Sequence, residues 1–310
     1  MYNFRKICFF LLLIATCFVT AGAMAQPQYD TISKFSMPVS MDTFVIKSGF
    51  DVNAFIRRVR TDTTFYKAFR SMRLRSYSAV NNIAAYNKNG SIAAAEYSRT
   101  RQEVVNGCRS TKVTDRKITG DYYRRKGEYN YYTAELFAYL FFTRGSICNE
   151  NDIVAGAMSE QGKGQMEQRK YELKQLIFNP GSEVRGIPFM GDRESIFDKG
   201  EADKYDFRIT MDIYEGQPCY LFRITPRTGY EHKVIYNELT TWFRKGDYSI
   251  LARDYSLSYH TLVYDFDVKM KVRTTQIDNK LYPTRINYDG DWHVFTKKRE
   301  RVKFSAEMSY

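Results

Sequence analysis

The last third of the chain alternates apolar and polar residues with a period of two. From residue 205 to residue 213 every odd position is apolar: Tyr205, Phe207, Ile209, Met211 and Ile213. Successive side chains of a β-strand point to opposite faces, so this period indicates strands with one buried face. Short segments such as Glu215-Gly216 and Lys245-Gly246-Asp247 separate the runs. Because tight turns join antiparallel neighbours, the pattern predicts a long antiparallel meander.

One run of the meander has the clearest division into two faces. Its apolar positions are Leu262, Tyr264, Phe266, Val268, Met270 and Val272, and charged residues from Asp265 to Arg273 alternate with them. A turn at Asp278-Asn279-Lys280 follows, and Asp289-Gly290-Asp291 leads to a final strand. A meander of this length has to curl, because sheets twist. We expect the apolar face to be concave and to need a cover.

Helical patterns in the N-terminal half could supply that cover. Asp51 is expected to cap a helix in which Val52, Phe55, Ile56 and Val59 lie on one face. A second helix after Thr61-Asp62 would turn Phe65, Tyr66 and Phe69 inward, and a third is expected from Gln165 to Phe178. Strands are expected from Leu74 to about Val113, with a hairpin at Asn87-Lys88-Asn89-Gly90.

An aromatic insert lies between the first strands and the meander. Its tyrosines are Tyr122, Tyr123, Tyr129, Tyr131 and Tyr132. Thr133 is expected to cap a short buried helix that runs through Phe142 and stops at Gly145. The tyrosines form either a packed aromatic corner or a cluster that faces a ligand.

The first residues have the features of a signal peptide. Arg5 and Lys6 precede an apolar run from Ile7 to Thr20, and Ala23-Met24-Ala25 supplies a cleavage site. A retained anchor and lipid attachment at Cys17 are the alternatives. The sequence thus predicts a signal peptide at 1–25 and a periplasmic or secreted single α+β domain at 26–310. Within this domain, 26–200 holds helices, first strands and the aromatic insert, and 201–310 is the meander.

The positive charge of the chain narrows the range of partners. The formal net charge is +12, and it falls to +10 when Arg5 and Lys6 leave with the signal peptide. Export argues against nucleic acid as the partner, and leaves anionic envelope surfaces. Lys297, Arg299, Arg301 and Lys303 share one face of the final strand, which we interpret as a surface for an anionic membrane. Ordinary solubility is the alternative.

Three cysteines remain after cleavage: Cys108, Cys148 and Cys219. An oxidising compartment permits one disulfide, and of the three pairings we favour Cys108 with Cys148, since both lie beside turn residues. Cys219 lies in a run typical of a strand. We expect no metal site and no cofactor, because these thiols and His232, His260 and His293 show no ligand spacing.

Candidate catalytic residues are few. Ser258 and His260 would share one face of a strand, and Asp265 and Asp267 would lie on the other face unless a bend between Tyr259 and Leu262 intervenes. The chain contains neither Gly-x-Ser-x-Gly nor His-Glu-x-x-His. We therefore expect a protein that is not an enzyme, with hydrolysis as the less favoured alternative.

The expected architecture is α+β, with a curved antiparallel sheet, like a half-barrel, covered by helices from the N-terminal half and the middle. Space left between helix and sheet would form an apolar pocket. Its lining would be Phe55, Ile56 and Val59 from a helix, facing Leu262, Tyr264, Phe266, Val268 and Met270 from the sheet.

Several segments resemble known proteins. The meander, with CYLFRITP, LTTWFRKGDYSILARDYSLSY and NKLYPTRINYDGDW, resembles the lipoprotein-carrier superfold of LolA and LolB over residues 204–304. DTTFYKAFR, YNYYTAELFAYLFFTRG and ENDIVAG, beginning at Asp62, Tyr129 and Glu150, are more similar to uncharacterised secreted proteins of Bacteroidetes. The carrier resemblance implies an exported envelope protein that binds a lipid or a lipoprotein acyl chain. A structural or protein-interaction module of the envelope is the alternative.

Overall fold

The computed structural model describes residues 39–41, 49–151, 178–181, 196–198, 200–261, 264–294 and 298–310. The chain divides into two compact units, Met1–Lys34 and Phe35–Tyr310, and all described residues belong to the second. The expected signal peptide lies outside the described residues, as does the expected helix from Gln165, apart from its last residue, Phe178.

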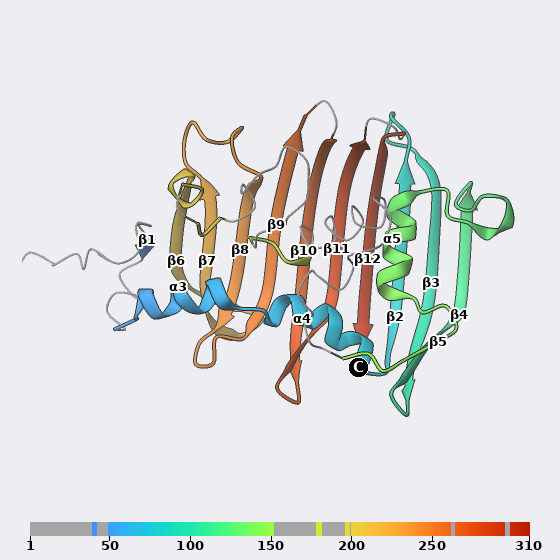
Figure 1. Ribbon diagram of the computed structural model, residues 1–310, viewed down its shortest axis with the longest axis horizontal. Coiled ribbons are helices and arrows are strands. Elements are labelled where there is room, and N and C mark those ends of the chain that lie inside the picture. The colour runs from blue at the N-terminus through green and yellow to red at the C-terminus, as the bar shows by residue number, and fades with distance from the viewer. Residues whose placement is uncertain are drawn as a thin grey trace, which may run out of the picture. The chain divides into compact units, whose positions relative to one another are not determined.

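The described residues form twelve strands in one open, curved sheet (Figure 1). The strand order is β1-β6-β7-β8-β9-β10-β11-β12-β2-β3-β4-β5. Of the pairings between them, β1 with β6 is parallel and the others are antiparallel. The predicted curved antiparallel sheet is confirmed.

The N-terminal strands are β1 (Val39–Met41), β2 (Tyr77–Tyr86), β3 (Ile92–Val105), β4 (Cys108–Gly120) and β5 (Ser146–Cys148). The C-terminal strands are β6 (Tyr205–Tyr214), β7 (Gln217–Pro226), β8 (Tyr236–Arg244), β9 (Ile250–His260), β10 (Tyr264–Ile277), β11 (Lys280–Val294) and β12 (Glu300–Ser309). The hairpin predicted at Asn87-Lys88-Asn89-Gly90 joins β2 to β3. The first strand region continues to Gly120, beyond the expected end near Val113.

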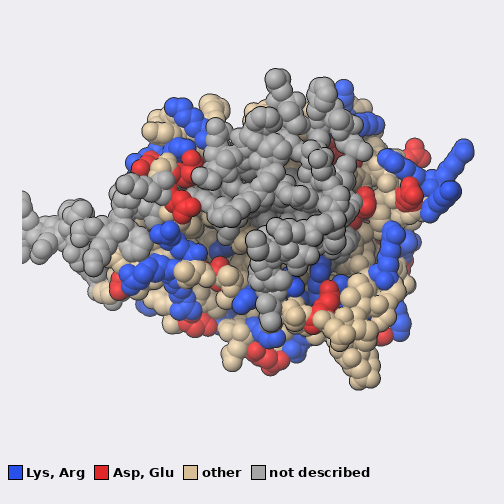
Figure 2. All heavy atoms as spheres, in the orientation of Figure 1, with Lys and Arg blue, Asp and Glu red and all other residues tan. Residues whose placement is uncertain are grey.

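Three α-helices of the described residues lie on one face of the sheet, which we call the inner face (Figure 1). Basic and acidic side chains alternate around the border of this face (Figure 2). The helices are α3 (Val52–Thr61), α4 (Thr64–Ser71) and α5 (Tyr132–Phe141). Short 3₁₀ turns η1 (Met72–Leu74), η2 (Arg125–Gly127) and η4 (Ala202–Lys204) accompany them. No described helix combines the length and the apolar character that a membrane crossing requires.

Helix α3 begins as predicted. The Asp51 carboxylate accepts a hydrogen bond from the backbone N–H of Ala54 at 2.9 Å, which satisfies a donor that has no partner inside the helix. Phe55 and Ile56 are buried and Val59 is half-buried. The local sequence is sufficient here, because the cap and its donor are three residues apart.

Helix α5 is capped differently from the prediction. Thr133 is not the cap, because the helix begins at Tyr132 and the N-cap position is Tyr131. The carboxylate of Glu300 on β12 accepts hydrogen bonds from the backbone N–H groups of Tyr132 (2.7 Å) and Thr133 (3.0 Å) and from the Thr133 hydroxyl. A negative charge at a helix N-terminus is also favoured by the helix dipole. The cap is therefore a tertiary contact between α5 and the last strand.

Two predictions for the meander were wrong. Ile213 is 72% exposed, although it continues the apolar alternation, because it lies beside the Glu215-Gly216 turn at the end of the β6–β7 hairpin. Asp289-Gly290-Asp291 does not lead out of a strand, since β11 runs through it and Gly290 pairs with Val268 and Val302. A Cβ atom at Gly290 would lie 2.0 Å from the Tyr288 hydroxyl oxygen. The glycine therefore allows the Tyr288 side chain to approach the backbone of its own strand.

The predicted disulfide is confirmed. Cys108 and Cys148 are bonded and lie opposite each other in the β4–β5 pair, while Cys219 is free and buried. Burial raises the pKa of the Cys219 thiol to about 11. Close to the disulfide, the buried Arg109 side chain binds the carboxylate of Glu150.

Candidate functional site

The inner face of β9 to β12 is apolar except for Arg253 of β9, which lies opposite Val272. On β10, Phe266, Val268, Met270 and Val272 are at most 1% exposed. The same face of the neighbouring strands carries Tyr255, Leu257 and Tyr259 on β9, Ile286 and Tyr288 on β11, and Val302 and Phe304 on β12. The strand register brings these side chains together. The alternation of apolar and charged residues correctly predicted that the apolar side chains of β10 share one face.

Helix α5 covers one part of this surface. The Phe137 ring stacks on Phe304 with 3.8 Å between the ring centroids, and it meets Tyr288 edge-on at 5.1 Å. Burial raises the pKa of Tyr288, whose hydroxyl accepts a hydrogen bond from the indole N–H of Trp292. These contacts fix the side chains where β11 and β12 meet.

Helices α3 and α4 cover other parts of the inner face. Phe55 of α3 packs edge-on against Phe222 and Phe243, from β7 and β8, at 5.4 and 5.2 Å between centroids. Phe65 of α4 contacts Tyr255 of β9, and α4 also packs against β11. A buried cation lies under α4, where the Arg253 guanidinium is 4.4 Å from the Phe65 ring centroid.

The sequence predicted one pocket lined by Phe55, Ile56 and Val59 together with residues of β10. In the structure, the described rings of the helix and of β10 contact different strands. Phe55 contacts rings of β7 and β8, whereas Phe266 contacts Tyr259 and Trp292 of the strands beside it. Leu262 lies outside the described residues. Tyr264 begins β10, and its side chain is not described.

The tyrosines of the aromatic insert pack against one another. Tyr122 is buried and lies edge-on to Tyr123, and both lie near Tyr129. The Tyr123 hydroxyl donates to the carboxylate of Glu96 on β3 at 2.6 Å. Burial and the Glu96 carboxylate raise the pKa of Tyr123 far above its ordinary value.

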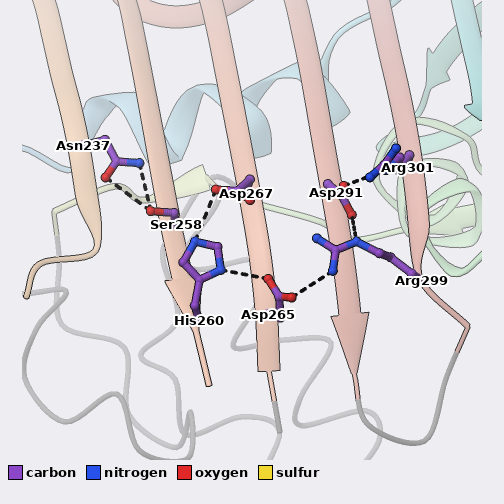
Figure 3. A network of polar contacts seen from close by, with 8 residues as sticks. All are labelled: Asn237, Ser258, His260, Asp265, Asp267, Asp291, Arg299 and Arg301. Carbon is purple, nitrogen blue, oxygen red and sulfur yellow. Dashed lines mark hydrogen bonds and ion pairs between the residues drawn. The ribbon is translucent and has the colours of Figure 1, made fainter. Parts of the chain in front are cut away.

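The basic residues of the last strand are paired with acids of the neighbouring strands on the outer face, opposite the helices (Figure 3). Arg299 binds Asp291 at 2.5 Å and Asp265 at 2.8 Å, and Arg301 binds Asp291 at 2.8 Å. Lys303 binds Asp289 at 3.0 Å, and Lys297 lies outside the described residues. These ion pairs offset much of the positive charge of this strand.

The chain reverses between β9 and β10, which is the exception that the predicted placement of Ser258, His260 and the two aspartates allowed for. Asp265 pairs with His260 and Asp267 with Ser258 across the two strands, so all four share the outer face. His260 Nδ1 lies 2.8 Å from Asp265 Oδ1, and Nε2 lies 3.6 Å from Asp267 (Figure 3). The sequence left this arrangement open, because it depends on how β9 pairs with β10.

This network does not form a Ser-His pair in the described geometry. The Ser258 hydroxyl is hydrogen bonded to Asn237, and the two ring nitrogens of His260 face carboxylates (Figure 3). Burial would raise the pKa of Asp265, but hydrogen bonds from His260 and Arg299 outweigh it and lower that pKa. Among the described residues, His260, Asp265 and Asp267 form a group whose ligand atoms lie within 4.8 Å of one another. Because Arg299 already neutralises the Asp265 carboxylate, this group is less suited to binding a metal cation.

No protein-family model and no curated protein sequence matches the chain. The fold is similar to that of a DUF1329 family protein from Desulfovibrio piger, with 15% identity over 85% of this chain and 91% of that chain, at a TM-score of 0.24. It is also similar to a chain described as an outer membrane lipoprotein-sorting protein domain from Vibrio parahaemolyticus, with 11% identity, 78% and 87% coverage, and a TM-score of 0.25. A match to lipovitellin has 6% identity, 75% and 24% coverage, and a TM-score of 0.25. The resemblance of the chain to lipoprotein carriers stays a prediction.

Proposed function

We propose that this chain is an exported envelope protein that binds an apolar or amphiphilic ligand, such as a lipid or an acyl chain, against the inner face of its curved sheet. The Cys108–Cys148 disulfide supports an oxidising compartment, since such bonds persist mainly outside the cytoplasm. The function is binding without catalysis.

The largely apolar inner face of β9 to β12 is the observation that carries the proposal. Twelve strands spaced about 4.8 Å apart span on the order of 55 Å, whereas α3 and α4, at about 1.5 Å per residue, extend on the order of 25 Å together. The described helices are therefore short relative to the sheet. We place the ligand at Phe266, which contacts rings of the neighbouring strands. Because Phe266 is 1% exposed, the ligand has to displace the side chains that cover it.

Native mass spectrometry of the protein, purified without detergent from its own source, tests this proposal. We expect a retained lipid, and we expect the delipidated protein to take up a fluorescent fatty acid. Val268→Trp adds bulk to the inner face and should reduce this uptake, whereas Lys269→Gln changes the adjacent outer-face residue and should leave it unchanged. Ligand-free protein that never takes up the probe would contradict the proposal.

A second candidate function, an interaction module, is supported by the edge at β4. Residues 108–110 pair with β5, while residues 111–120 have β3 as their partner among the described strands. Val113 and Ile118 of this segment are 43% and 44% exposed. An open strand edge can accept an added strand from another chain. Ile118→Pro should then abolish partner binding while leaving fatty acid uptake intact.

A further inference from the structure

A groove of about 560 Å³ crosses the outer face from β10 to β3. Lys269 and Lys271 line it from β10, where they alternate with the buried Val268 and Met270 of the inner face. The groove is therefore separated from the proposed apolar site by the thickness of the sheet. It plays no part in the function proposed above.

Small side chains at adjacent positions create the hollow. Ala84 of β2 lies between Lys303 of β12 and Ala95 of β3 in the strand register. Ser305 comes two residues after Lys303 on the same face. Longer side chains stand on both sides of these short ones, so the surface is recessed where they meet.

The floor of the groove can both donate and accept hydrogen bonds. Asn287, Ser305 and Asn82 form one row across β11, β12 and β2. Within the part of the chain that the structure describes, their side chains make no hydrogen bond. Amide and hydroxyl groups suit a ligand that also donates and accepts, such as a polyol, better than one that only accepts.

The two ends of the groove differ. Lys269 and Lys271 line the β10 end, and Lys269 has no ion-pair partner among the described residues. Lys303 lies in the middle of the groove, where it binds Asp289, an acid that also lines the groove. Lys271 lies 4.0 Å from Asp254, an acid that also binds Arg273. Lysine acts as a point charge that suits separate negative groups, in contrast to the bidentate fork of arginine.

Aromatic rings line the other end. Tyr86 and Tyr97 are half-buried there, and the Lys303 ammonium lies 5.8 Å from the Tyr86 ring centroid. A tyrosine ring offers an apolar surface together with a polar hydroxyl. Such rings can pack on the C–H face of a sugar.

From these features together we propose that the outer groove binds an acidic oligosaccharide, whose hydroxyls meet the amide floor, whose ring packs on the tyrosines and whose carboxylates lie among the lysines. The groove is open to solvent, so a longer chain can continue beyond it. Binding should involve no covalent step.

Titration calorimetry on the full exported chain tests the inference with oligogalacturonate as the probe. We expect binding that weakens as salt rises, and no binding of the methyl-esterified oligomer, which lacks the charge. Lys269→Gln with Lys271→Gln should weaken binding about tenfold, as expected for lost charge complementarity. Ala84→Phe fills the hollow without a change in charge and should abolish binding. Lys112→Gln, which changes an outer-face lysine that does not line the groove, should have no effect.

Four outcomes would overturn the inference. These are equal binding of the esterified oligomer, equal weakening by Lys112→Gln, normal binding by the Ala84→Phe protein, and no binding of oligogalacturonate at millimolar concentration. Inorganic phosphate and anionic phospholipid vesicles provide two further arms. If the parent protein binds the vesicles but not oligogalacturonate, and Ala84→Phe abolishes the vesicle binding, the ligand of the groove is a membrane surface instead. Because fatty acid uptake is measured separately, failure here leaves the inner-face proposal intact.

Discussion

The two ends of the sheet bury different chemistry on the same inner face. Strands β6 to β9 bury large apolar side chains, including Phe207, Phe222, Phe243 and Leu257. Strand β3 instead buries Ala94 followed by a polar row, Glu96, Ser98, Thr100 and Gln102. In both regions, buried and exposed side chains alternate with a period of two. The alternation therefore predicts which side chains share a face, but it does not predict what packs against that face.

Specific partners make the polar row compatible with burial. Gln102 donates to the backbone carbonyls of Met72 and Arg75 at 2.8 and 2.7 Å, and Asn81 donates to Thr100 at 3.1 Å. A buried polar group is tolerated when it is hydrogen bonded and costly when it is not. The apolar end should therefore respond to lost volume, and the polar end to lost partners.

The largest expected effect is in the apolar end. Phe222→Ala removes a ring that packs against Phe55 and Phe207, and it should lower the free energy of unfolding by about 3–5 kcal/mol in chemical denaturation. If β10 faces a ligand, Phe266→Ala should cost less than about 3 kcal/mol and should alter fatty acid retention. Equal losses, with unaltered retention, would mean that β10 only packs.

The disulfide stabilises the polar end covalently. The bond joins residues 40 positions apart, and replacing both Cys108 and Cys148 by Ser should cost about 2–4 kcal/mol in the same assay. Cys219→Ala, which breaks no bridge, serves as the control and should cost less. A similar loss in both proteins would argue against a stabilising role for the bond.

Loss of a buried partner should have a smaller effect. Gln102→Leu keeps the volume but leaves two carbonyls without their donor, so we expect a loss of about 1–3 kcal/mol. Arg101→Gln, on the exposed face of the same strand, should stay within about 0.5 kcal/mol. If the Gln102→Leu variant is as stable as the parent protein, the polar end of the sheet is not sensitive to the loss of hydrogen-bond partners.

The cap of α5 links the last strand to the helix over it. Glu300→Ala removes the acceptor for two backbone N–H groups and should cost about 1–2 kcal/mol. Glu307→Ala, an exposed position on the same strand, is the matched control. Amide exchange in residues 132–135 should accelerate in the first variant, and unchanged exchange there would contradict the capping role.

The smallest effect concerns the outer face. The folded-state pKa of Asp265 is lowered, so its contribution to stability is present above its unfolded pKa of about 3.9 and is lost as the pH falls through the lower folded value. At pH 6 the parent protein should be more stable than the Asp265→Asn variant by less than about 1 kcal/mol, because the network is partly exposed. This difference should shrink below about pH 4. Urea unfolding between pH 6 and pH 3 checks this, and a pH-independent difference would contradict it.

The sequence predicted features whose cause is local. The alternating faces of β10 and the Asp51 cap depend on residues a few positions apart, and the turn residues beside Cys108 and Cys148 indicated how they pair. The Glu300 cap could not be predicted, because donor and acceptor are more than 160 positions apart and Thr133 offered a local alternative. The shared face of His260 and Asp265 depends on strand register, and the outer groove depends on small residues from β2, β3 and β12 becoming neighbours.

The position of β12 has a consequence for how the molecule assembles. Strand β12, the last described strand in sequence order, lies inside the sheet, with β11 on one side and β2 on the other. Strand β2 therefore pairs with a strand that is far from it in the sequence, and contacts between such distant residues slow folding. Until the two strands pair, the edge of β2 is a free template for aggregation. A chain that lacks Glu300–Ser309 would lose the strand that joins β11 to β2.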